Sequence, residues 1–146
     1  MELKVKRLTD TAKLPTKAHA TDACFDLYVD EPELKSVSIN PGEAFSFHTG
    51  IATEIAFGYF SAVFARSGLG IKRNLRPSNC VGIIDCDYRG EWMVGLYNDS
   101  NTVQVINHGD RVAQFCILPV LDVDIIDSTD LSDTERSING FGSSGA

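Results

Sequence analysis

Short segments in which apolar and polar residues alternate run along most of this chain, with turn residues between them. Alternation with a period of two is typical of half-buried β-strands. We expect strands at 1–8, 25–29, 45–55, 59–64, 80–84, 91–98, 112–118 and 123–126. Helical periodicity is weak, and 67–73 is a short candidate helix. The pattern predicts an all-β sandwich or jelly roll, in the form of a jelly-roll-like barrel of short strands.

Two turns are expected to close hairpins. The turn at 85–90 would join the buried strand 80–84 to its partner 91–98, and the turn at 98–101 would lead into the residues around Val103 and Val105.

Size and charge narrow the functional classes. The chain has 146 residues, 43% of them hydrophobic, which suits one domain with a real core. A net charge of -7 argues against a general nucleic-acid or membrane-surface binder. No apolar run approaches the length of a membrane span, and residues 1–8 lack a signal peptide's apolar core, so we expect a cytoplasmic protein. No Cys-x-x-Cys pair or zinc spacing occurs, and we expect buried, reduced thiols at Cys24, Cys80, Cys86 and Cys116.

The 82–91 stretch carries the densest chemistry. It places two carboxylates, a phenol and a guanidinium in one tight turn, at Asp85, Asp87, Tyr88 and Arg89. A solvated surface turn is the ordinary interpretation of a lone Asp-x-Asp. Polar, glycine-bearing blocks elsewhere in the chain favour a reactive site instead.

Three such blocks are suited to phosphate. Residues 65–70 combine Arg66 with a hydroxyl and glycines, without the spacing of a P-loop or a nucleophile elbow. Residues 109–114 open a strand, where the Asp-Arg pair is predicted to be structural and the polar Gln114 needs a partner. Residues 140–145 match G-x-G-x-x-G but lack the βαβ context of a dinucleotide site. Their backbone N–H groups can still approach a phosphate closely.

Together these blocks resemble the five motifs of the trimeric dUTP pyrophosphatase (dUTPase) family, in order and over about residues 22–145. The matching segments are 23–27, 65–69, 82–90, 109–114, and Arg136 with 140–145. Cys24 stands where the family usually has Gly, and Ala65 where it usually has Pro. Residues 137–139 replace a run that is often richer in glycine.

The resemblance implies hydrolysis of dUTP to dUMP and pyrophosphate with Mg²⁺, which lowers dUTP and supplies dUMP for dTMP synthesis. Asp85 matches the residue that activates the water attacking the α-phosphorus, and Asp26 matches a carboxylate that holds Mg²⁺ through water. Residues that match substrate contacts are Arg66, Ser67, Gly68, Asn79, Gly82, Asp85, Tyr88, Met93, Gln114, Arg136, Phe141, Gly142, Ser143 and Ser144.

The resemblance also implies a homotrimer whose sites are shared between subunits, with dUTP as the ligand and neither nucleic acid nor membrane as a partner. Residues 1–126 are expected to form the jelly-roll domain, and 127–146 an acidic linker and mobile C-terminal arm. Two alternatives remain. One is a dCTP deaminase-like enzyme, whose Glu-centred pattern is not found. The other is a nucleotide-binding regulatory protein on the same fold, which loss of Asp85 or of the arm would have favoured.

Overall fold

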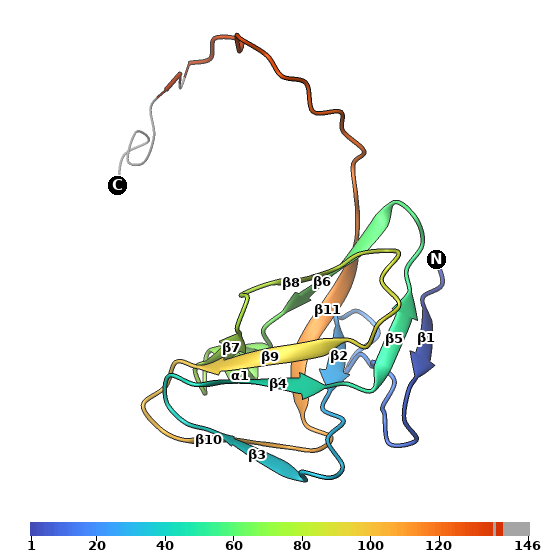
Figure 1. Ribbon diagram of the computed structural model, residues 1–146, viewed down its shortest axis with the longest axis vertical. Helices are drawn as coiled ribbons and strands as arrows, with labels where there is room; N and C mark the ends of the chain where they lie inside the picture. The colour runs from blue at the N-terminus through green and yellow to red at the C-terminus, as the bar shows by residue number, and fades with distance from the viewer. Residues whose placement is uncertain (136, 139–146) are drawn as a thin grey trace.

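The computed structural model describes residues 1–135, 137 and 138. Within them the chain forms short strands and one helical turn (Figure 1). The elements are β1 (Lys4–Arg7), β2 (Phe25–Tyr28), β3 (Ser36–Ile39), β4 (Ala44–His48), β5 (Ile51–Glu54), β6 (Tyr59–Phe64), α1 (Ser67–Gly70), β7 (Leu75–Pro77), β8 (Gly82–Ile84), β9 (Met93–Asn98), β10 (Gln104–Asn107) and β11 (Arg111–Pro119). The predicted all-β class is confirmed.

Two antiparallel sheets form the body of the fold. One has the strand order β2-β11-β6-β8 and the other β4-β9-β7, while β1 pairs with β5 and β10 with β3. Buried side chains from both larger sheets belong to one core, in which Trp92 meets Phe115 edge-to-face with ring centroids 4.9 Å apart. The sheets therefore face each other as a sandwich of the jelly-roll kind. Across the described residues they do not close into a barrel, so that detail of the prediction is wrong.

Both predicted hairpins are wrong in their pairing. β8 pairs with β6, whereas β9 pairs with β4 and β7 in the opposite sheet. β10 likewise pairs with β3 and not with β9. The turn at 85–90 therefore carries the chain from one sheet to the other. Alternation alone cannot reveal this, because it records which face of a strand is buried and not which strand lies beside it.

The predicted strand at 45–55 is two strands, because the chain turns at Gly50. Gly50 has φ of 65°, a conformation that glycine adopts without a Cβ penalty. Next to it, Thr49 Oγ1 donates a hydrogen bond to the carbonyl oxygen of Trp92 at 2.5 Å. The turn ends the pairing with β9 and lets β5 pair with β1.

The strand expected at 123–126 is not formed. β11 ends at Pro119, and residues 120–135 leave the body as an extended, exposed segment (Figure 1). Its apolar side chains stand in solvent, with Ile125 97% exposed. A strand needs backbone partners. The Val120 N–H donates to the Gly58 carbonyl oxygen at 2.8 Å, but within the described part of the chain residues 123–126 make no backbone hydrogen bond.

Two smaller observations complete the fold. The cysteines are free thiols, but Cys80 is exposed and the other three are half-buried, so the expectation of burial is wrong. Among the residues that the structure describes, no helix is long and apolar enough to cross a membrane.

Candidate functional site

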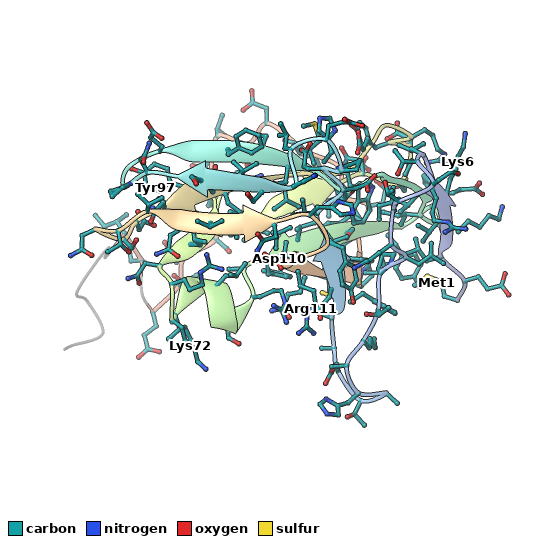
Figure 2. All side chains as sticks on the ribbon, turned by 90° about the horizontal axis from the view of Figure 1, so that it is seen from below. Met1, Lys6, Lys72, Tyr97, Asp110 and Arg111 are labelled. Carbon is teal, nitrogen blue, oxygen red and sulfur yellow. The ribbon has the colours of Figure 1, made fainter. Side chains whose placement is uncertain are left out.

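Asp26, a buried carboxylate on β2, is the centre of a charged corner of the four-stranded sheet. Its Oδ1 accepts a hydrogen bond from Arg66 Nε at 2.6 Å, and its Oδ2 accepts one from Arg111 Nη1 at 3.0 Å. Arg111 lies beside β2, opposite Tyr28 (Figure 2). We call Asp26, Arg66, Arg111 and Gln114 the Asp26 corner, and all four line one cavity of about 390 Å³.

The Asp26 corner is suited to a phosphate chain. A guanidinium carries five N–H donors in a fork that matches phosphate oxygens. Within the described structure, Arg66 and Arg111 each donate one N–H to Asp26. The other N–H groups of each guanidinium remain available to an anion. Asp22 lines the same cavity, and the hydrogen bond from the His19 backbone N–H lowers the pKa of its carboxyl. The two carboxylates of this cavity balance its two guanidinium groups. The Asp26 corner therefore offers a phosphate oriented N–H donors and little net positive charge.

Strand register explains why Gln114 joins this corner. Gln114 on β11 lies opposite Asp26 on β2, so the two side chains share one face of the sheet. Its Nε2 donates to the carbonyl oxygen of Ala65 at 3.0 Å, which is the partner that the sequence predicted it would need. This bond fixes the backbone just before Arg66. Ser67 and Gly68 follow at the start of α1 and are exposed.

A second cavity of about 290 Å³ lies between β8 and β9, and we call it the β8 cavity. Three predicted site residues line it, namely Asn79, Gly82 and Met93. A Cβ at Gly82 would lie 3.3 Å from Val63 Cβ and 3.7 Å from Asn79 Nδ2. Glycine at 82 therefore leaves room that any side chain would fill.

The walls of the β8 cavity were mostly not predicted. Leu27, Val63 and Trp92 line it from the core, and Ser46 and Ser78 add hydroxyls. Periodicity marks Leu27, Val63 and Trp92 as apolar strand residues, but nothing in the sequence distinguishes a cavity wall from ordinary core. An apolar cavity with few polar groups is the usual form of a small-molecule site.

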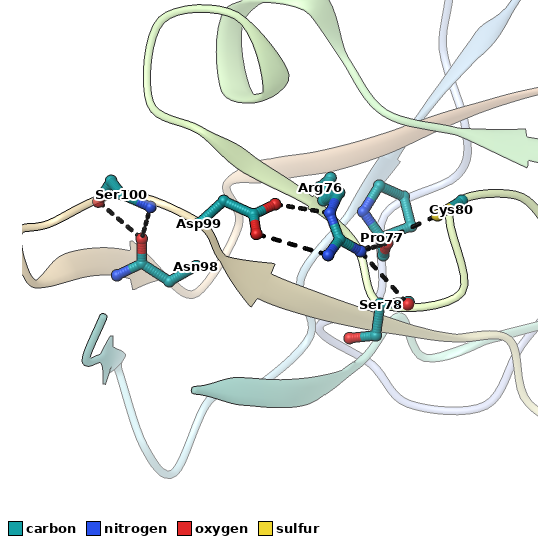
Figure 3. Close-up of polar contacts among 7 residues, drawn as sticks. All are labelled: Arg76, Pro77, Ser78, Cys80, Asn98, Asp99 and Ser100. Carbon is teal, nitrogen blue, oxygen red and sulfur yellow. Dashed lines mark hydrogen bonds and ion pairs between the residues drawn. The ribbon is translucent and has the colours of Figure 1, made fainter. Parts of the chain in front are cut away.

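Arg76 holds the segment that carries Asn79 (Figure 3). Its Nε donates to Asp99 Oδ2 at 2.5 Å, and its Nη1 donates to the carbonyl oxygens of Pro77 and Ser78 at 3.3 and 3.4 Å. The Asp99 carboxylate raises the pKa of Arg76, and the guanidinium also lies over the Tyr97 ring. These contacts hold Pro77 and Ser78, which line the β8 cavity, close to β9.

Asp85 directly follows Ile84, which lines the β8 cavity. The backbone N–H of Tyr88 donates to the carbonyl oxygen of Asp85 at 3.2 Å, so the predicted tight turn is confirmed. The Tyr88 hydroxyl donates to the Glu91 carbonyl oxygen at 3.1 Å, and the residue is 45% exposed. The Asp85 side chain is exposed, with no hydrogen bond or ion pair to another described residue. The carboxylate is therefore open to water, one residue beyond the end of β8.

Glu91 anchors the far end of this turn. Its Oε1 accepts from the Gly50 backbone N–H at 2.8 Å, and its Oε2 lies 2.8 Å from His48 Nδ1. The hydrogen bond to Glu91 raises the pKa of His48. The turn is thus fixed at both ends, by β8 on one side and by the β4–β5 junction on the other.

The Asp26 corner and the β8 cavity lie on opposite faces of one sheet. Successive strand residues point to opposite faces. Asp26 lines the first cavity and its neighbour Leu27 lines the second. The two linings share no residue. The structure therefore brings together Asp26, Arg66 and Gln114, and separately Asn79, Gly82 and Met93, but does not join the two groups within one chain.

The donor set limits how a divalent cation could bind. Both oxygens of Asp26 already accept hydrogen bonds from guanidinium groups. Within the described residues, no cluster of three or more His, Cys, Asp or Glu side chains could hold a metal ion. Asp26 therefore fits a contact to metal-bound water and does not fit direct coordination, in keeping with the reluctance of Mg²⁺ to lose its waters.

Some predicted residues lie outside the described part, and one contributor was missed. Arg136, Phe141, Gly142, Ser143 and Ser144 fall outside the described residues.

Arg111 belongs to the Asp26 corner, although its sequence context predicts a structural pair with Asp110. Asp110 instead accepts from the Asn107 backbone N–H at 2.8 Å, while Arg111 reaches Asp26.

A jelly-roll-like sandwich with an arginine-bearing corner and a separate, largely apolar cavity is suited to a ligand that joins phosphates to an uncharged ring, as in nucleotide-binding proteins. The dUTPase family profile matches residues 10–145, and the chain belongs to the dUTPase family. It is 43% identical over 145 residues to the deoxyuridine 5'-triphosphate nucleotidohydrolase of Nautilia profundicola, covering 99% of both chains. It is 42% identical over 146 residues to the protein of the same name from Hydrogenobaculum sp., again covering 99% of each.

Solved dUTPase structures share the fold of this chain. A point mutant of the Staphylococcus bacteriophage 80alpha dUTPase with dUpNHpp superposes with a TM-score of 0.88 at 26% identity, covering 99% of each chain. A phage phi11 dUTPase mutant, described with a coordinated structural Mg(II) ion, shares the fold with a TM-score of 0.77 at 24% identity, covering 89% of this chain and 98% of that one.

Proposed function

We propose that this protein is a dUTP diphosphatase that hydrolyses dUTP to dUMP and pyrophosphate. Family membership over nearly the whole chain supports this function. The observation that carries the mechanism is that Asp85 directly follows Ile84, which lines the β8 cavity, and that the Asp85 side chain is exposed. Neither alternative has comparable support: Asp85 is present in the sequence, and the curated relatives carry the nucleotidohydrolase name.

In the proposed reaction, the Asp85 carboxylate takes a proton from water while the water oxygen attacks the α-phosphorus. A new P–O bond forms, the bond from the α-phosphorus to the bridging oxygen breaks, and pyrophosphate leaves. A positioned base typically contributes about 10²–10⁴-fold to rate. Mg²⁺, carried by the triphosphate and held through water by Asp26, would make the phosphorus a better electrophile and offset the charge of the leaving group.

The β8 cavity is the proposed nucleoside site. Asn79 and the backbone around Gly82 would read the uracil edge, with Met93 alongside, because a wrong donor pattern leaves buried groups unpaired. Tyr88 would pack against the deoxyribose and leave no room for a 2′-hydroxyl. Arg136, Phe141, Gly142, Ser143 and Ser144 are proposed to complete the site as an arm that covers the base and the terminal phosphate. The boundary between domain and arm, at 126/127, stays a prediction, as does a cytoplasmic location.

The two-faced geometry supports shared sites in a homotrimer. A nucleotide bound in the β8 cavity cannot reach Arg66 and Gln114 of the same chain, because they lie on the other face of the sheet. The corner would therefore come from another copy. The exposed apolar side chains after Pro119, including Val123 and Ile125, also favour cover by a neighbouring copy.

Product identification tests the activity. The purified protein is incubated separately with dUTP, dCTP, dTTP and UTP, and the products are resolved by anion exchange. We expect dUMP and pyrophosphate from dUTP, with the other nucleotides turned over far more slowly. Excess chelator should suppress most of the turnover. Orthophosphate as the product, ammonia from dCTP, or UTP turnover equal to that of dUTP would contradict the proposal.

Complementation tests the shared site. Two inactive variants, Asp85→Asn and a chain truncated after Glu135, are unfolded and refolded together. In mixed trimers some sites receive Asp85 from one chain and an arm from another, so activity should return. As a matched control, the truncated chain also carries Asp85→Asn, and this mixture should stay inactive. Proven mixed oligomers without recovered activity would contradict the shared site and leave the diphosphatase activity itself standing.

A further inference from the structure

Cys24, which directly precedes β2, neighbours Cys116 on β11. The β2–β11 register pairs Phe25 with Phe115, whose rings stack at 5.6 Å, and it pairs Asp26 with Gln114. One step further along this antiparallel register, Cys24 comes opposite Cys116. Because side chains alternate along a strand, this pair projects from the same face as Asp26 and Gln114.

The two thiols are close enough to influence each other. Burial raises the pKa of Cys24, and the neighbouring Cys116 thiol raises it further. Directly opposed residues in an antiparallel pair have Cα atoms about 4.5–5.5 Å apart. That range lies within the Cα separation of about 4.4–6.8 Å that disulfides require. Neither residue is fully buried, so a small reagent has access to the pair.

We propose that Cys24 and Cys116 form a redox-active dithiol that closes to an intramolecular disulfide by exchange with a small-molecule disulfide. The thiolate of one cysteine attacks a sulfur of the reagent, forms a mixed disulfide and releases one thiolate of the reagent. The thiolate of the second cysteine then attacks the protein sulfur of that mixed disulfide and releases the other. The two protein thiols lose two protons and two electrons, and the reagent disulfide is reduced to two thiols.

The bond would fix one wall of the Asp26 corner. Cys24 lines that cavity together with Ala18, Asp22 and Ala23, which belong to the irregular segment before β2. Cys116 lies within β11, which pairs on both sides, with β2 and with β6. A disulfide would therefore tie the irregular wall of an anion-binding cavity to a central strand. This inference concerns the chain's own thiols and does not depend on the proposed activity.

The full-length protein is reduced, freed of reductant, and equilibrated with oxidised glutathione at pH 8.5. A basic pH is chosen because the thiolate is the attacking species and the pKa of Cys24 is raised. The reaction is quenched with acid and alkylating reagent, and peptides are mapped without reduction. We expect a Cys24–Cys116 cross-link within one chain, with Cys80 and Cys86 alkylated or carrying glutathione. Reductant should reverse the cross-link.

Variants make the result decisive. The double variant Cys80→Ser/Cys86→Ser retains the proposed pair and should form the same cross-link, whereas Cys24→Ser and Cys116→Ser should each stop at a glutathione adduct. Oxidation should raise the melting temperature of the Cys80→Ser/Cys86→Ser protein by roughly 5 °C or more, because the bond closes a loop of about 90 residues.

Three results would overturn the proposal. These are a persistent glutathione adduct at Cys24 in the parent protein, a cross-link only between chains, or a fall in melting temperature on oxidation. The last would show that the reduced fold does not hold the thiols in bonding geometry.

Discussion

The carboxylate of Asp26 should stabilise the fold far more than a surface carboxylate with an equally short hydrogen bond. Asp26→Asn keeps the shape but removes the charge that two guanidinium groups share. The side chains of Asp26 and Arg66 are 11% and 24% exposed, and that of Arg111 is 45% exposed. A hydrogen bond to a charged group contributes about 1.5–3 kcal/mol. Asparagine retains one acceptor oxygen and water recovers part of the Arg111 contact, so we expect a net loss of about 2 kcal/mol.

Glu54→Gln is the matched control. Glu54 Oε1 accepts from Lys4 Nζ at 2.8 Å, but the two side chains are 51% and 72% exposed. Water and salt screen exposed pairs of this kind, so their contribution to stability is small. Glu54→Gln should therefore leave the urea midpoint close to that of the parent protein.

Urea unfolding, followed through the fluorescence of the single tryptophan, Trp92, measures both losses. All proteins are compared at one chain concentration, because assembly adds to apparent stability. Equal losses of unfolding free energy for Asp26→Asn and Glu54→Gln would refute the view that burial makes the hydrogen bonds of Asp26 contribute more to stability.

Three further outcomes are expected. Asp85→Asn should lower kcat by about 10²–10⁴-fold while dUTP-analogue binding stays within a few-fold; near-normal turnover would remove Asp85 as the base. Glu91 raises the pKa of His48, so this pair's stabilisation is complete below about pH 6.5 and is lost as pH rises through the raised value. Because His48 is half-exposed, His48→Gln should remove a pH-dependent difference of under about 1 kcal/mol between pH 6 and 9 in urea unfolding. Gly50→Ala should cost at least about 2 kcal/mol, because its φ is positive and a Cβ there meets buried side chains, whereas Gly58→Ala, with positive φ and open space, should cost about 1 kcal/mol.

Much of the secondary structure could be predicted because alternation records burial directly. The strand at 59–64 has the predicted bounds, and the candidate helix at 67–73 contains α1. Strand pairing could not be predicted in this way. A strand with one buried face satisfies the same pattern beside any partner that covers the core, and in this fold β8 and β9, which are neighbours in the sequence, lie in opposite sheets.

The candidate site shows the same division between local and non-local information. Arg66 and Gln114 could be singled out because each sits in a local block with recognisable chemistry, whereas Asn79 was named only through the family resemblance. Arg111 could not, because its neighbour Asp110 offers a plausible local partner, and only the β2–β11 pairing brings its guanidinium to Asp26. The thiol pair of Cys24 and Cys116 is equally invisible along the sequence, since about 90 residues separate its members.

The two candidate cavities lie on opposite faces of one sheet, so a single chain does not form a complete nucleotide site. β2 carries Asp26 and the core residue Leu27 side by side, so its two faces line two different cavities. A monomeric enzyme would need a long loop to bring the Asp26 corner around the sheet edge to Asp85. Within residues 1–135 the long connection 8–24 already forms a wall of the cavity at the Asp26 corner, on its own face of the sheet. The extended segment after Pro119 leads away from the body with its apolar side chains uncovered. In the proposed homotrimer, identical copies would bring the two faces together without lengthening any loop and would cover that segment at the same time, so the geometry favours sites built between chains.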